Sequence, residues 1–150
     1  MGVPQTITSE DFSSGMELGE AVFGPLELSD IVRYAHASGD SNPIHVEEDY
    51  ARSSGAPTVF AMGMLPAGYL GHALSDWFGG PHHLRRFKVR FTTRVWPGDE
   101  LVCAGRVQSI EGRLITVRLE ARRRGPGPQG LELATEEIAL LGEADVEVPE

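Results

Sequence analysis

The stretch "GMLPAGYLGHALSDWF" at residues 63–78 predicts the element around which the chain is built. Its large apolar side chains recur at helical spacing and form one broad face: Leu65, Tyr69, Leu70, Ala73, Leu74, Trp77 and Phe78. Small residues form a second stripe: Ala67, Gly68, Gly71 and Ser75. Pro66 falls in the first turn, where proline is tolerated. We therefore expect one helix over 63–78 that is largely enclosed by other elements.

The apolar period changes to two directly after this helix. In "FKVRFTTRV" (87–95), the apolar residues alternate with basic or polar ones. Further strands are expected over 101–110, 114–122 and 131–141, and the 20–28 segment is expected to join them. Short connections favour antiparallel pairing. The sequence thus predicts the α+β class, with an antiparallel β-sheet packed around one long central helix.

Two shorter helices are expected before the long one. Ser29 is the predicted N-cap of the first, and Gly39 occupies the position where that helix stops. The second is expected over 47–55. No linker divides the sequence, so we expect a single domain over 1–150 with an acidic, solvent-exposed tail at 142–150.

Composition excludes several classes of function. The formal net charge of −9 argues against general nucleic-acid binding, and no apolar run is long enough for a transmembrane helix. The N-terminal residues lack the basic and apolar regions of a secretory signal. Cys103 has no partner for an internal disulfide and is expected to be a buried, unreactive thiol. These features predict a cytoplasmic protein.

The stretch "SGDSNPIH" at residues 38–45 contains the strongest candidates for catalysis. Asp40 and His45 would diverge on a helix and would lie on opposite faces of a strand, so only a bent loop can bring them together. Asn42 and Pro43 favour such a turn. A carboxylate and a neutral imidazole that converge can hold one water and move its proton. The alternative is a turn-capping Asp40 beside an ordinary surface histidine.

Gly63 would leave a bare backbone amide at the start of the long helix. Such an amide, assisted by the helix dipole, can stabilise a developing oxyanion, although close packing also explains a glycine here. A metal site that combines His36, Asp40 and His45 with the acidic residues 47–49 is a competing interpretation. Because that acidic run resembles the solvated first turn of a helix, we expect no metal and no other cofactor.

The sequence resembles the MaoC-like (R)-specific enoyl-thioester hydratases and dehydratases. The resemblance rests on three motifs in order, and it extends over about residues 10–141: "YAHASGDSNPIHVEEDYAR" (34–52), "FAMGML" (60–65) and "FKVRFTTRVWPGDEL" (87–101). It implies a hot-dog fold, which agrees with the apolar periods. It also implies reversible hydration of trans-2-enoyl thioesters of CoA or acyl carrier protein, without a cofactor, by a homodimer with the cleft at its interface.

The resemblance implies roles for individual residues. Asp40 and His45 would hold the water that adds to C3 and pass a proton to C2, while the Gly63 amide would polarise the thioester carbonyl. The substrate-binding residues would include Asn42 and Met64. Met62 would be a third substrate-binding residue. Many members of the family have histidine at this position, so the difference is expected to affect which acyl groups are accepted.

Two other functions compete with the hydratase. A hot-dog thioesterase would lack the "GDSNPIH" signature, and a non-catalytic acyl-binding or partner subunit of a heteromeric dehydratase would be expected to lose the Asp/His pair. This chain has both.

Nine of the 13 basic residues fall in 85–94 and 118–124. In one interpretation Lys88, Arg90, Arg94 and Arg118 form the solvent face of neighbouring strands and pair with carboxylates. In the other, Arg85, Arg86 and some of Arg122 to Arg124 line the cleft mouth and meet the phosphates of CoA or the acidic face of a carrier protein.

Overall fold

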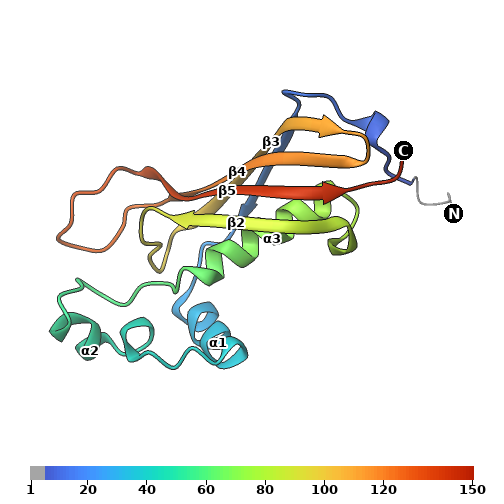
Figure 1. Cartoon of the computed structure of the whole chain (residues 1–150). Coiled ribbons are helices and arrows are strands. Elements are labelled where there is room, and N and C mark those ends of the chain that lie inside the picture. The colour runs from blue at the N-terminus through green and yellow to red at the C-terminus, as the bar shows by residue number, and fades with distance from the viewer. Residues whose placement is uncertain (1–5) are drawn as a thin grey trace, which may run out of the picture.

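The computed structural model describes residues 6–150, which form one five-stranded antiparallel sheet with helices on one side and at one end (Figure 1). The strand order is β1-β3-β4-β5-β2. The strands are β1 (Glu17–Phe23), β2 (Leu84–Phe91), β3 (Glu100–Glu111), β4 (Leu114–Arg124) and β5 (Glu136–Glu147). The long helix α3 (Met64–Trp77) lies along the sheet, whereas α1 (Leu28–Ser38) and α2 (Glu48–Ser53) lie beyond one end of it. The predicted fold class is confirmed.

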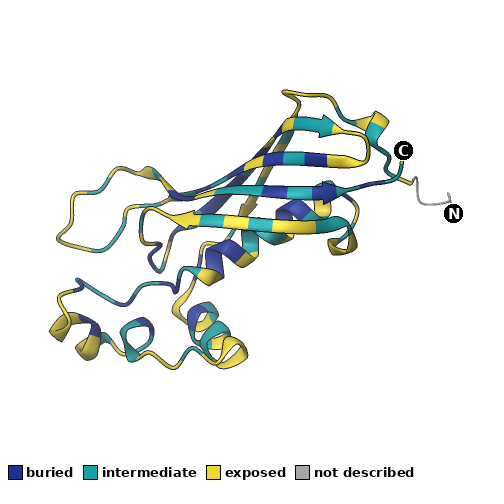
Figure 2. Cartoon of the chain, viewed as in Figure 1, coloured by how far each residue is buried: buried dark blue, intermediate teal, exposed yellow. Residues whose placement is uncertain are grey.

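α3 packs on the sheet through its apolar face. Ala67, Leu70, Ala73 and Leu74 are buried in one cluster with the inward side chains of β3, β4 and β5. Burial of each leucine contributes about 1.5–3 kcal/mol. The enclosure is incomplete, because a stripe on the side away from the sheet is exposed in the single chain (Figure 2): Met64, Gly68, His72 and Asp76. The helices formed by residues 6–150 are all too short or too polar to span a lipid bilayer.

The start of α1 differs from the expectation. Glu27, not Ser29, is the N-cap, because the Asp30 carboxylate accepts a hydrogen bond from the Glu27 amide at 2.9 Å. The predicted stop is confirmed, since Gly39 follows the helix with φ +75°, a conformation that glycine adopts without strain.

The strand boundaries shift along the chain. β1 ends at Phe23 rather than at residue 28, and β2 begins at Leu84 and ends at Phe91, so residues 92–95 continue beyond the strand. The "EG" hairpin is confirmed, because β3 and β4 pair up to Glu111 and Leu114 across Gly112.

The expectation of a solvent-exposed tail at 142–150 is wrong, because β5 extends to Glu147. Ala144 and Val146 are buried between β4 and β2, while Glu143 and Asp145, which alternate with them, lie on the outer face. Both outer carboxylates pair with Arg86 of β2. The alternation of small or apolar residues with acidic ones, rather than the net charge, is the better predictor of structure here.

Cys103 lies fully buried in β3, and burial raises the pKa of its thiol to about 12. Since the thiolate is the reactive form, almost none exists near neutral pH. We expect no reaction of the native protein with Ellman's reagent at pH 8 and stoichiometric reaction after denaturation. Labelling of the folded protein within minutes would contradict this assignment.

Candidate active site

The loop after α1 brings Asp40 and His45 together. Asn42 caps a single 3₁₀ turn (Pro43–His45), where its side-chain oxygen accepts from the Ile44 amide at 3.1 Å. The Asn42 amide donates to Asp40 Oδ1 at 3.2 Å. Asn42 therefore holds the loop and orients the Asp40 carboxylate, but its side chain is not part of the cavity wall described below.

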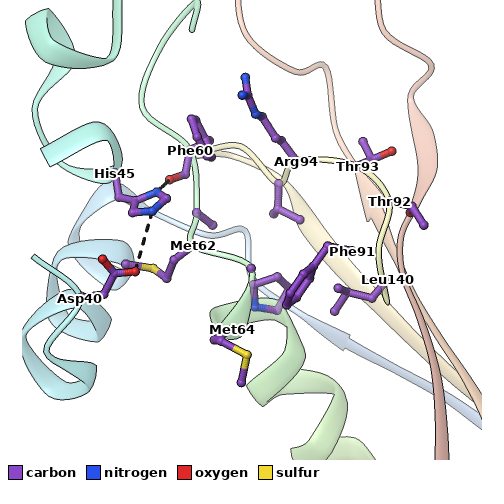
Figure 3. A pocket seen from close by; sticks show the side chains of 14 residues that line it. Asp40, His45, Phe60, Met62, Met64, Phe91, Thr92, Thr93, Arg94 and Leu140 are labelled. Carbon is purple, nitrogen blue, oxygen red and sulfur yellow. Dashed lines mark hydrogen bonds and ion pairs between the residues drawn. The ribbon is translucent and has the colours of Figure 1, made fainter. Parts of the chain in front are cut away.

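The two candidate side chains face each other, with Asp40 Oδ2 at 3.9 Å from His45 Nε2 (Figure 3). His45 Nδ1 lies 2.8 Å from the Phe60 carbonyl oxygen, which only accepts, so Nδ1 carries the ring proton. In the neutral ring Nε2 is then an acceptor, as is the carboxylate opposite. A water beside both can donate one hydrogen to each.

This pair opens into a cavity of about 420 Å³, a volume typical of small-molecule sites. Its walls come from the segment before α3, the first turn of α3, the residues at the end of β2, and Leu140 of β5 (Figure 3). Most of the lining is apolar. Of the expected site residues, the cavity brings together Asp40, His45, Met62, Gly63 and Met64.

Gly63 lies at the N-terminus of α3 and on the cavity wall. Within residues 6–150, neither its amide nor that of Met64 donates a hydrogen bond to the backbone, and no side chain caps the helix. Such amides carry the positive end of the helix dipole. A Cβ at Gly63 would lie 2.8 Å from the Phe91 ring, so close packing also favours glycine here. Both interpretations of this glycine fit the structure.

The donors of the alternative metal site do not converge. Glu48 accepts from the Thr58 hydroxyl at 2.8 Å and pairs with Arg52 at 3.0 Å, and the Thr58 hydrogen bond is the main cause that lowers the pKa of the carboxyl. His36 is exposed on α1. Among residues 6–150, no three side chains of histidine, cysteine, aspartate or glutamate gather closely enough to hold a metal ion.

The structure contradicts the placement of Arg85 and Arg86 at the cleft mouth. Neither lines the cavity. Arg85 pairs with Glu147 at 3.1 Å, and Arg86, which lies opposite Asp145 in the sheet, is held between Asp145 and Glu143. These arginines neutralise the outer face of β5.

Arg122 to Arg124 are also engaged elsewhere. Arg122 pairs with Glu20, Glu120 and Glu136, and Arg124 pairs with Glu100. Arg123 is fully buried and pairs with the buried Asp99. None of the three lines the cavity.

Sequence reasoning missed the aromatic and cationic part of the site. Phe60, Phe91 and Arg94 all line the cavity. In the solvent-face interpretation Arg94 is exposed and paired with carboxylates; it is exposed, but it forms no ion pair within residues 6–150. Because β2 ends at Phe91, the alternation of faces stops there, and residues 91–95 all reach the cavity.

Comparison with known proteins identifies close relatives. The sequence model of a family described as "MaoC like domain" matches residues 8–122. The chain is 32% identical over 143 residues to an (R)-specific enoyl-CoA hydratase from Rhodospirillum rubrum, a match that covers 93% of this chain and 90% of that protein. It is also 32% identical over 141 residues to a 3-hydroxybutyryl-CoA dehydratase from Methylorubrum extorquens, and this match covers 93% of this chain and 83% of that protein.

A solved structure shares the fold. The R-hydratase PhaJ1 from Pseudomonas aeruginosa superposes with a TM-score of 0.79 at 23% identity, over 97% of this chain and 87% of that one. At this identity the likeness concerns the fold alone, and the expected hot-dog fold is confirmed.

Proposed function

Because this chain belongs to the MaoC-like domain family, we propose that it is a hydro-lyase that reversibly hydrates trans-2-enoyl thioesters to (R)-3-hydroxyacyl thioesters. The observation that carries the assignment is the Asp40–His45 pair, 3.9 Å apart, in one cavity with the free Gly63 amide. The named relatives act in the same class of chemistry, since one is an (R)-specific enoyl-CoA hydratase and another a 3-hydroxybutyryl-CoA dehydratase.

The geometry supports a stepwise path for the atoms. The bridging water attacks C3, and the electrons of the C2–C3 double bond move onto the thioester oxygen. The Gly63 amide donates to that oxygen and stabilises the enolate-like state. The Asp40/His45 pair takes one proton from the water and returns a proton to C2, so that the elements of water are added without oxidation or reduction.

The substrate is a thioester of CoA or of acyl carrier protein. Met62 and Met64 form part of an apolar wall, and the buried Met62 gives this wall a flexible thioether in place of a polar ring. The acyl group therefore meets an apolar surface next to the reacting carbons.

The direct test of the activity is incubation of the purified protein with crotonyl-CoA, followed by loss of the enoyl absorbance. We expect rapid loss and a product that proves to be (R)-3-hydroxybutyryl-CoA on a chiral column. No change in absorbance, or release of free CoA instead, would overturn the hydratase assignment, and the second result would favour a thioesterase.

We further propose that the chain forms a homodimer through the free edge of β2. β1 and β2 are the two edge strands of the sheet, and an unpaired edge offers backbone groups to another chain. The apolar side chains of Phe91 and Met64 are 53% and 56% exposed beside the cavity. Light scattering at micromolar concentration should give twice the chain mass of 16.3 kDa; a clean monomer would contradict the dimer.

In the cell we place this dimer in the cytoplasm.

A further inference from the structure

Among the described residues that line the cavity, Arg94 is the one arginine or lysine, and it has no ion-pair partner there. Within residues 6–150 it forms no ion pair and donates no hydrogen bond, and residues 1–5 contain no carboxylate side chain. Most other arginines of the two basic clusters are paired with glutamate or aspartate. A guanidinium left unpaired at the wall of a largely apolar cavity retains all of its donors for a ligand.

Phe60 fixes the position of this guanidinium. The Arg94 Cζ atom lies over the Phe60 ring, 4.3 Å from its centroid, and such a contact stabilises the cation by about 0.5–1 kcal/mol at an exposed site. This contact places the guanidinium carbon over the ring, and within residues 6–150 no N–H group of Arg94 donates a hydrogen bond, so these groups stay free for a ligand. Figure 3 shows the Arg94 side chain beside Phe60, with Phe60 between it and His45.

The same ring ties Arg94 to the proposed catalytic pair. Phe60 meets the His45 ring edge-on with centroids 5.1 Å apart, and its carbonyl oxygen holds His45 Nδ1. The Arg94 Cζ atom lies 4.3 Å from the Phe60 centroid, which in turn lies 5.1 Å from the His45 centroid. The distance from Cζ to the centre of the imidazole therefore cannot exceed the sum of these two distances.

This distance decides which part of a substrate Arg94 can reach. The phosphate of a CoA or carrier-protein thioester lies a full pantetheine arm away from the reacting carbons, and that arm, when extended, is longer than the separation set by Phe60. An anion at the far end of a short acyl chain fits the spacing. We propose that Arg94 is a specificity-determining residue that binds a carboxylate at the distal end of the acyl group, so that the enzyme accepts enedioyl thioesters.

This inference rests on the proposed function, but it can be tested without turnover. Hexanoyl-CoA and adipyl-CoA are saturated thioesters of equal chain length that differ in the terminal methyl and carboxylate groups. Their binding is measured by calorimetry to the wild-type protein, to Arg94→Gln and to Arg94→Lys. Arg90→Gln is the matched control, because Arg90 is also exposed, has no ion-pair partner within residues 6–150 and does not line the cavity.

We expect Arg94→Gln to weaken adipyl-CoA binding about 10- to 100-fold, as loss of a charge-assisted hydrogen bond implies, and to change hexanoyl-CoA binding less than about 3-fold. Arg94→Lys should recover part of the loss, and Arg90→Gln should alter neither ligand. Equal weakening of both ligands, or of neither, would overturn the inference. Equal weakening that disappears with the corresponding pantetheine thioesters would assign Arg94 to the phosphate instead.

Hydration assays separate this outcome from failure of the proposed function. With trans-2-hexenoyl-CoA and trans-2-hexenedioyl-CoA, wild type should hydrate both, and Arg94→Gln should lose kcat/KM selectively on the second. Absence of hydration of both by wild type would reject the hydratase, while the binding ratio would still decide the role of Arg94.

Discussion

Asp40→Asn and His45→Ala should each lower kcat/KM for hydration of crotonyl-CoA at least about 100-fold while leaving the fold intact. Asparagine keeps the size of the side chain and an oxygen that can accept from the Asn42 amide, but its amide has no proton affinity near neutral pH. Alanine at 45 removes Nε2, which is one of the two groups that hold the water, and also the Nδ1 contact with the Phe60 carbonyl.

A second histidine–aspartate pair provides the control. His72 Nε2 and Asp76 Oδ2 lie 3.4 Å apart on α3, and their side chains are 62% and 68% exposed, outside the cavity. His72→Ala and Asp76→Asn should therefore retain activity within about 3-fold, since exposed pairs contribute little. Circular dichroism of all four variants reports the fold. Near-wild-type activity of folded Asp40→Asn or His45→Ala would show that the assigned pair does not move the proton.

The acid–base pair is easier to predict from the sequence than the residues that contact the substrate. Asp40 and His45 lie five residues apart, and the turn residues between them, Asn42 and Pro43, define their approach locally. From the sequence alone, Arg85, Arg86 and Arg94 are indistinguishable cations on or next to one strand. Their roles differ because carboxylates of β5 pair with Arg85 and Arg86, whereas Arg94 lies beyond the end of β2 and has no carboxylate partner within residues 6–150. Such cross-strand partners depend on register, which the sequence of one strand does not contain.

Burial of a basic residue was predictable from periodicity alone. On β4 the buried residues Ile115, Val117, Leu119 and Ala121 alternate with exposed or half-buried ones, and the next inward position is Arg123. Its neighbours Arg122 and Arg124 point outward, as period two requires. Treating "RRR" as one basic cluster therefore hid a residue with a different environment. What periodicity could not predict is that Asp99, from the turn before β3, lies beside it.

The Asp99–Arg123 pair is the most deeply buried ion pair described in the protein. Their side chains are 1% and 0% exposed, and the guanidinium meets the carboxylate through two parallel bonds, Nε to Oδ2 at 2.7 Å and one terminal nitrogen to Oδ1 at 2.8 Å. Asp99 also accepts from the Trp96 amide, and Arg123 donates to the Gly125 and Ala134 carbonyls at the two ends of the β4–β5 loop. The pair thus joins the turn that follows the cavity wall to that loop.

Removal of either partner should destabilise the protein by about 3–5 kcal/mol. Without Arg123 the buried Asp99 carboxylate has no cation beside it, and without Asp99 two buried donors of Arg123 lose their acceptor, although Glu137 still pairs with Arg123 at 3.1 Å. We expect this loss for Asp99→Leu and for Arg123→Met in urea unfolding at fixed protein concentration, which holds any contribution of the dimer constant. The control is Arg124→Ala, one residue along the same strand. Arg124 pairs with Glu100 at 3.4 Å, but the two side chains are 44% and 37% exposed, so its loss should cost less than about 1 kcal/mol.

The double variant Asp99→Leu/Arg123→Met distinguishes a paired charge from simple loss of packing. If each single variant suffers mainly from the charge that its partner leaves behind, removal of both removes that penalty, and the double variant should be clearly more stable than the sum of the two losses predicts. It should not reach wild type, because the Trp96 amide and the two loop carbonyls then lack their partners, each at a cost of about 1–3 kcal/mol. Additive losses, or single variants no less stable than Arg124→Ala, would show that the pair does not hold this end of the sheet.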